Sequence, residues 1–243
     1  MTIFRLSEPK RRADCADAVD AVDLTGPPRI ALVRRVRQEP PKRIGALAAS
    51  FNPPTKAHLK MAEIAHTESG CGEILMELAK ANVDKKTEHA PLHERLMMLD
   101  LMAQGRDWMS IGVGSHGRFI DKTAAIRELY PASDIVFIVG YDTFIRVFDE
   151  KYYDDRDAEL DALFSAAAFL CANRLDDGVE AVETLLSRPE NRRFRGAVQT
   201  MRLPQKYADM SSSSARLHAG SRKAMEELTP KVADYIRRRN LYR

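Results

Sequence analysis

Short apolar runs and longer amphipathic stretches alternate along the chain from Arg43 onward. The apolar runs have the length of buried strands, and the longer stretches carry apolar residues at helical spacing. Strands that alternate with helices in this way are typical of βαβ units. The pattern therefore predicts an α/β fold, namely a Rossmann-like, doubly wound parallel sheet with helices on both faces and a C-terminal helical segment. Expected strands are residues 44–49, 73–78, 109–113, 134–139, 167–171 and 197–201, and expected helices are 58–68, 92–104, 123–129 and 179–186.

The first 42 residues form an N-terminal extension that differs from the body of the chain, residues 43–243. The extension has no sustained periodicity and contains charge clusters and two Pro-Pro pairs. Residues 30–36 could form one edge strand, and the alternative is a poorly ordered tail.

The first expected strand is followed by a turn with candidate phosphate chemistry. Asn52-Pro53-Pro54 cannot continue a strand or a helix, so Thr55 and His58 lie where a strand leads into a helix. Free backbone N–H groups and the helix dipole favour an anion there. A donor-rich Thr/Lys/His cluster at such a turn predicts a phosphate site. The alternative is a βα turn with a capping threonine and a surface histidine.

A second candidate anion site lies far downstream, where four serines precede a helical pattern. Ser211 to Ser214 offer hydroxyl and N–H groups at a helix start. Arg216 follows and can bind phosphate with two parallel hydrogen bonds. The alternative is a flexible serine linker that also caps the helix.

Both motifs resemble signatures of the nucleotidylyltransferase superfamily. Residues 50–53 read Ser-Phe-Asn-Pro and resemble S/T-F-[DN]-P, and residues 55–58 resemble [HT]-x-G-H with Ala57 in place of glycine. The serine motif resembles I-S-S-[ST]-x-x-R, with Met210 in place of isoleucine. The resemblance implies a nucleotidylyltransferase domain over residues 43–243. It implies catalytic roles for His58, Thr55 and Arg216, and ATP-binding roles for Ser50, Phe51, Thr55, His58, Gly140, Asp142, Ser211, Ser212, Ser213 and Arg216.

The segments between these motifs are similar to those of nicotinate and nicotinamide mononucleotide adenylyltransferases. The similar segments are residues 85–99, 119–123, 135–142, 172–174 and 228–242. The ring-stacking Trp of that family is missing after residues 140–142, and Phe148, Tyr152 or Tyr153 are candidates to replace it. Asp142 has a second interpretation as a helix N-cap. The resemblance implies that substrate is bound by Lys85, Lys86, Arg95, Phe119, Thr123 and Arg174.

The implied reaction transfers the adenylyl group of ATP to nicotinate or nicotinamide mononucleotide and releases pyrophosphate, a step of NAD biosynthesis. The acceptor phosphate is already an anion, so catalysis requires positioning and charge neutralisation rather than a general base. Mg²⁺ would accompany ATP and be held mainly by phosphates, without dedicated protein ligands. Alternatives are adenylyl or cytidylyl transfer to another phosphate acceptor such as phosphopantetheine, and a non-catalytic nucleotide-binding regulator.

Composition agrees with a cytoplasmic enzyme that binds ATP and a mononucleotide. The net charge of +3 results from 38 basic and 35 acidic residues, which indicates a mixed surface and no nucleic-acid partner. Three scattered cysteines argue against a disulfide or zinc framework. No window reaches the roughly 18 apolar residues of a membrane span, and no signal peptide or membrane partner is expected. The oligomeric state stays open, a homo-oligomer included.

Overall fold

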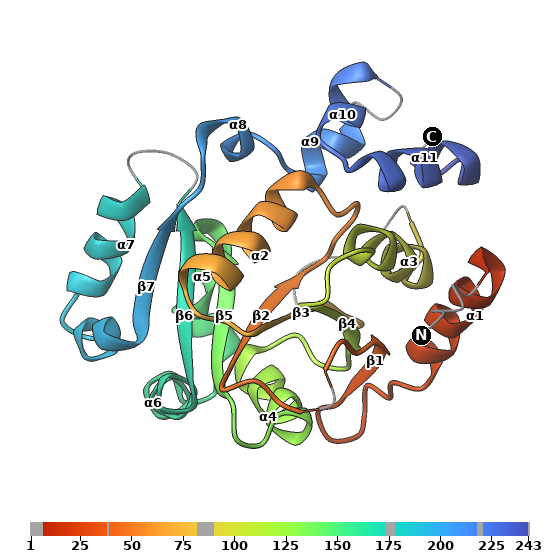
Figure 1. Cartoon of the computed structure of the whole chain (residues 1–243). Helices are drawn as coiled ribbons and strands as arrows, with labels where there is room; N and C mark the ends of the chain where they lie inside the picture. Colours follow the sequence, from red (N-terminus) through yellow and green to blue (C-terminus); the bar gives the residue numbers. More distant parts are fainter. Residues whose placement is uncertain (1–6, 38, 82–89, 174–177, 218–220, 243) are drawn as a thin grey trace.

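One seven-stranded sheet organises the chain in the computed structural model, which describes residues 7–37, 39–81, 90–173, 178–217 and 221–242 (Figure 1). The strand order is β1-β4-β3-β2-β5-β6-β7. β1 runs antiparallel to β4 at one edge, and every other neighbouring pair is parallel. The strands are β1 (Ile30–Arg34), β2 (Arg43–Ala49), β3 (Glu73–Ala79), β4 (Met109–Gly114), β5 (Asp134–Gly140), β6 (Ala167–Asn173) and β7 (Val198–Arg202).

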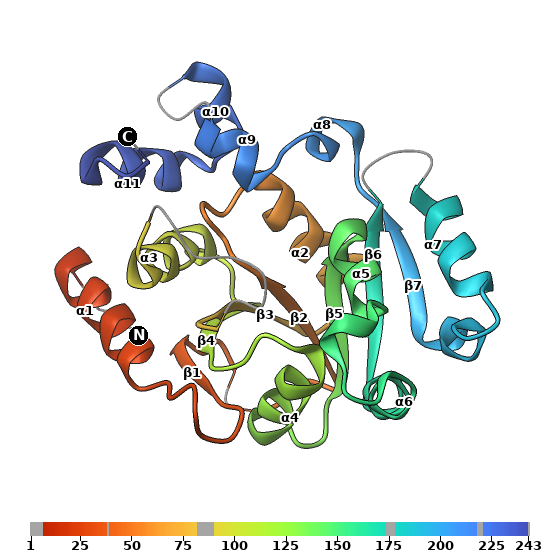
Figure 2. The same cartoon turned by 180° about the vertical axis from the view of Figure 1, so that it is seen from behind.

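Helices cover both faces of the sheet, as the alternating pattern predicted (Figures 1 and 2). One core unites apolar residues of α1, α2, α3 and α11 with one face, and a second core unites α4, α5, α6 and α7 with the other. The helices are α1 (Glu8–Asp20), α2 (Lys56–Glu68), α3 (Leu92–Ala103), α4 (Phe119–Leu129), α5 (Tyr141–Val147), α6 (Arg156–Ala166), α7 (Gly178–Ser187), α8 (Gln205–Ala208), α9 (Ser212–Leu217), α10 (Arg222–Glu226) and α11 (Pro230–Arg239), with 3₁₀ turns at Glu150–Tyr152 and Arg192–Ala197.

The six expected strands and four expected helices are all present, and most boundaries agree within two residues. The largest difference is α4, which begins at Phe119 rather than at residue 123. Within the described residues, no helix is long and apolar enough to cross a membrane.

The strand order reverses between β2 and β5. The chain moves from β2 outward through β3 to β4, and then returns to place β5 on the other side of β2. Leu47 of β2 lies opposite Ile138 of β5, so the two strands end at the same level. Ligands of open α/β sheets bind at such a switch point, outside the carboxyl ends of the strands. The predicted phosphate turn follows β2, and Gly140 ends β5.

The described part of the N-terminal extension contains a helix and a strand. Residues 30–34 form an antiparallel edge strand, which was one of the two interpretations, and residues 8–20 form a helix that was not predicted. Cys15 and Val22 contribute to the core beside α3. The helix has few apolar positions and no clear periodicity, and ion pairs of Arg11 with Asp100 and of Arg12 with Glu94 attach it to α3.

Candidate active site

The turn after β2 fixes the orientation of His58. Thr55 is fully buried and is the N-cap of α2. Its backbone nitrogen lies 3.1 Å and its hydroxyl oxygen 2.8 Å from Nδ1 of His58. A backbone N–H can only donate, so Nδ1 accepts, and the proton of the neutral ring is then on Nε2. The capping box therefore presents an imidazole whose Nε2–H can donate to a phosphate oxygen.

Phe51 supports the same ring from the side. Its ring packs edge-on against His58 with the centroids 5.1 Å apart, and its side chain is fully buried. The backbone of Phe51 has a φ of 42°, in the left-handed region that non-glycine residues rarely adopt. Residues held in such conformations are found at binding and active sites more often than elsewhere.

The serine motif packs directly onto this turn, although more than 150 residues separate the two in sequence. Nη1 of Arg216 donates to the carbonyl oxygen of Asn52 at 2.5 Å, and Oγ of Ser212 donates to that of Pro53 at 2.8 Å. Nη2 of Arg216 lies 3.1 Å from the hydroxyl of Ser213. The structure thus brings the two predicted phosphate motifs together into one site (Figure 1).

Arg95 also reaches the turn. Its side chain is almost fully buried on α3, with Nε donating to the carbonyl oxygen of Ala90 at 2.7 Å and Nη1 to that of Ser50 at 3.4 Å. Burial lowers the pKa of this guanidinium, and the nearby charge of Arg216 acts in the same direction. Two positive side chains therefore converge on the turn, an arrangement that favours a polyanionic ligand.

Gly140 and Asp142 lie at the neighbouring strand end. Gly140 is the N-cap of α5, and Asp142 is an exposed residue in the first turn of that helix. The interpretation of Asp142 as the N-cap is therefore wrong. An exposed carboxylate at the switch point is available to accept hydrogen bonds from ribose hydroxyls.

Phe119 and Thr123 have structural partners on α4. The Thr123 hydroxyl is buried and donates to the carbonyl oxygen of Phe119 at 2.9 Å. The Phe119 ring packs edge-on against Phe137 and Phe169. Both contacts belong to the core on the α4 face, so the substrate-binding roles of Phe119 and Thr123 stay predictions. Lys85, Lys86 and Arg174 lie outside the described residues.

The three candidates for the missing tryptophan differ in their surroundings. Phe148 is buried in an aromatic cluster with Phe144, Phe164 and Phe194. The Tyr153 hydroxyl donates to the carbonyl oxygen of Val147. Tyr152 is partly exposed. Burial in this cluster argues against Phe148, and the ring-stacking roles of Tyr152 and Tyr153 stay predictions.

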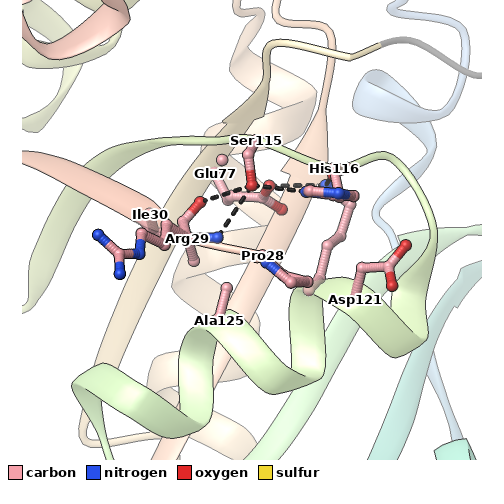
Figure 3. A pocket seen from close by; sticks show the side chains of 10 residues that line it. Pro28, Arg29, Ile30, Glu77, Ser115, His116, Asp121 and Ala125 are labelled. Atoms are coloured by element: carbon pink, nitrogen blue, oxygen red, sulfur yellow. Dashed lines mark hydrogen bonds and ion pairs between the residues drawn. The ribbon is translucent and has the colours of Figure 1, made fainter. Parts of the chain in front are cut away.

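A small pocket lies on the α4 side of the sheet, beside the end of β4 (Figure 3). Oγ of Ser115 lies 2.7 Å from Nδ1 of His116, and Lys122 forms a buried ion pair with Glu77 at 2.6 Å. The residues that line this pocket belong to neither phosphate motif. In the described part of the chain, no three His, Cys, Asp or Glu side chains are grouped to hold a metal ion. The donors at the turn are hydroxyl, imidazole and guanidinium groups, which suit phosphate oxygens rather than a cation.

Sequence reasoning missed two residues that contact the site. The Tyr242 hydroxyl donates to Oδ1 of Asn52 at 2.8 Å, and the backbone N–H of Lys56 donates to the carbonyl oxygen of Glu227 at 2.8 Å. Tyr242 belongs to a segment that was similar to the adenylyltransferases, but similarity alone gave no contact.

Sequence comparisons find similar proteins that are assigned as adenylyltransferases. The chain is 33% identical over 141 residues to a Schizosaccharomyces pombe protein assigned as a nicotinamide mononucleotide adenylyltransferase, and it spans about half of that protein's length (55%). It is 27% identical to a Streptococcus pneumoniae protein assigned as a nicotinate-nucleotide adenylyltransferase, over 88% of this chain and 95% of that protein.

Solved structures share the fold. The Plasmodium falciparum nicotinic acid mononucleotide adenylyltransferase, complexed with NaAD, superposes with a TM-score of 0.62 and 21% identity, over 83% of this chain and 97% of that one. The profile of the cytidylyltransferase-like family matches residues 47–217, a span that begins in β2 and ends with α9. The chain therefore belongs to the cytidylyltransferase-like family, and the assignment to the nucleotidyltransferases made from its two phosphate motifs is confirmed.

Proposed function

We propose that the protein transfers the adenylyl group of ATP to nicotinate or nicotinamide mononucleotide, forming the dinucleotide and releasing pyrophosphate. The observation that carries the proposal is the contact between the two motifs, in which Arg216 and Ser212 bind the turn that orients His58. The names of the relatives from Schizosaccharomyces pombe and Streptococcus pneumoniae support a pyridine mononucleotide as the acceptor.

The residues at the turn supply positioning and charge. The acceptor phosphate attacks the α-phosphorus of ATP, and pyrophosphate leaves on the opposite side. His58 donates from Nε2 to the transferring phosphate, whereas Arg216 and the serine hydroxyls neutralise the leaving pyrophosphate. No proton must be removed from the nucleophile, so no carboxylate or cysteine base is needed. Mg²⁺ bound with ATP would supply further charge neutralisation and would be held mainly by phosphate oxygens.

The nicotinate form is the expected acceptor. A carboxylate on the ring calls for an arginine or backbone N–H groups, and the sequence offers Arg118, Arg146 and Arg174 near strand ends. Arg118 already pairs with Asp121 and Glu159, at 3.1 and 2.9 Å. Arg146 is exposed in the last turn of α5. Arg118 and Arg146 are therefore the two described candidates for binding a ring carboxylate.

Pyrophosphate release over a panel of substrates tests the proposal. Nicotinate mononucleotide, nicotinamide mononucleotide and phosphopantetheine are each offered with ATP or CTP. We expect turnover with ATP and a pyridine mononucleotide, and a clear preference for the nicotinate form, because donors built for a carboxylate stay unpaired with an amide. Equal specificity constants would remove the preference. Turnover with phosphopantetheine or CTP alone would support the corresponding alternative, and nucleotide binding without any turnover would support a regulator.

A further inference from the structure

The last residues of the chain turn back toward the phosphate turn. α11 ends at Arg239, and Asn240 caps it in the left-handed conformation with a φ of 54°. Tyr242 is also left-handed, with a φ of 66°. Asparagine tolerates this region, but a tyrosine in this conformation is strained and persists only where its surroundings hold it. The contacts of Tyr242 must therefore favour this conformation.

Those contacts converge on Asn52. The Tyr242 hydroxyl donates to Oδ1 of Asn52 at 2.8 Å, while Nη1 of Arg216 donates to the backbone carbonyl oxygen of the same residue at 2.5 Å. Asn52 is itself buried. One residue of the turn is thus held from two sides, by its side chain and by its backbone. The Tyr242 ring is partly buried against the α2–α3 core.

Tyr242 also lies close to both cations of the site. Burial raises the pKa of the Tyr242 phenol, and the charges of Arg95 and Arg216 oppose that rise. The phenol remains protonated near neutral pH and acts as a hydrogen-bond donor to Asn52.

Glu94, a buried residue of α3, fixes α11, the helix that precedes Tyr242. Glu94 is almost fully buried and accepts hydrogen bonds from the Tyr235 hydroxyl and from Arg239 on α11. Nε of Arg12 on α1 donates to the same carboxylate at 2.9 Å. α11 is therefore held firmly enough for the residues that follow it to contact the turn in one arrangement.

We infer that Tyr242 is a positioning residue of the active site. Its hydroxyl holds the Asn52 side chain, so that the backbone carbonyl of Asn52 keeps the Arg216 guanidinium directed at the ATP phosphates. The inference rests on the proposed function. If Asn52 moves, Arg216 loses the backbone carbonyl oxygen that sets the direction of its guanidinium group. The remaining contact with Ser213 fixes only one side of the guanidinium. Tyr242 acts through Arg216 and need not touch the substrate.

Tyr242→Phe tests this role because it removes only the hydroxyl. We expect the KM for ATP and the Kd for Mg-ATP to rise roughly five- to tenfold, the loss typical of one hydrogen bond, while the KM for the mononucleotide stays unchanged. Asn52→Leu should produce a similar rise, and Tyr242→Phe should add little to it. Asn52→Asp keeps an acceptor for the phenol, so Tyr242→Phe should still weaken ATP binding in that background.

Tyr130→Phe is the matched control. Its hydroxyl donates to the buried carboxylate of Glu73 at 2.6 Å, at the opposite end of the sheet. This variant should lose stability without any change in the KM or Kd for ATP. Unchanged ATP constants in Tyr242→Phe would overturn the inference, and so would an equal change in Tyr130→Phe.

The two readouts separate this inference from the proposed function. Calorimetric titration with Mg-ATP measures the Kd without an acceptor. If the wild type binds ATP but turns over no pyridine mononucleotide, the proposed acceptor is wrong while the weaker binding of Tyr242→Phe still supports the positioning role. If the wild type binds no ATP, both are overturned.

Discussion

Replacing Lys122 by methionine should destabilise the protein much more than breaking an ion pair of equal length on the surface. Nζ of Lys122 lies 2.6 Å from Oε1 of Glu77, and the two side chains are 5% and 0% exposed. The other oxygen, Oε2 of Glu77, has no hydrogen-bond partner in the described structure. Lys122→Met therefore leaves a carboxylate between β3 and α4 with no compensating charge.

The expected magnitude follows from this burial. Removal of one partner of a buried pair costs about 3–5 kcal/mol, because the remaining ion stays desolvated. For a chain of this size, that loss lowers Tm by roughly 6–20 °C. Lys122→Met also removes the 3.0 Å hydrogen bond from Nζ to the carbonyl oxygen of His116. The double variant Glu77→Leu/Lys122→Met has no buried charge, so it should recover stability to within about 1–2 kcal/mol of the wild type.

Lys10→Met is the matched control. Nζ of Lys10 lies 2.7 Å from Oδ1 of Asp14, but these side chains are 58% and 32% exposed. A surface pair of this kind contributes about 0–1 kcal/mol. Urea unfolding followed by circular dichroism gives the free energy of unfolding of all four proteins. The reasoning is refuted if Lys122→Met costs no more than Lys10→Met, or if the double variant is as unstable as Lys122→Met.

Four further outcomes are expected. His58→Ala should lower kcat roughly 10²–10³-fold with little change in the KM for the acceptor, because one donor to the transition state is lost. Steady-state kinetics with His66→Ala as the control measures this, and a kcat within about threefold of wild type would exclude the role of His58. Arg216→Lys should recover little of the activity lost in Arg216→Ala, because an ammonium cannot serve the Asn52 carbonyl and a phosphate as the guanidinium fork does; full activity of the lysine variant would contradict this. Burial raises the pKa of Glu94, but hydrogen bonds from Tyr235 and Arg12 outweigh this effect, so the pKa is lowered from 4.5. The stability that results is present above pH 4.5 and is lost as the pH falls below it, and the urea midpoints of Glu94→Gln should lack this dependence on acid. Deletion of residues 1–40 should give a less stable, aggregation-prone protein, because it exposes the edge of β4 and removes the arginine partners of α3. If light scattering finds a monomer and calorimetry finds the wild-type Tm, the extension is dispensable.

The sequence by itself determined six strands of the sheet, the helices α2, α3, α4 and α7, and the position of the two predicted phosphate motifs. Strands such as β2 and β5 are buried on both faces, so they read as continuous apolar runs that local pattern can identify. The turn at residues 52–55 was equally local, because consecutive prolines end a strand wherever they occur. Position in the chain then placed both the turn and Gly140 at the carboxyl edge of the sheet.

Only the tertiary structure decided how these parts meet. α1 escaped prediction because it has few apolar residues and no clear period, and both Cys15 and ion pairs with α3 hold it in place. Arg95 has its position beside Ser50 because the fold brings α3 against the turn. The pairing of Tyr242 with Asn52 joins residues 190 positions apart, and no periodicity or spacing encodes such a contact. Local hydrophobic pattern fixes which residues enter a strand or helix, whereas the direction of a buried polar side chain depends on the partners that packing brings to it.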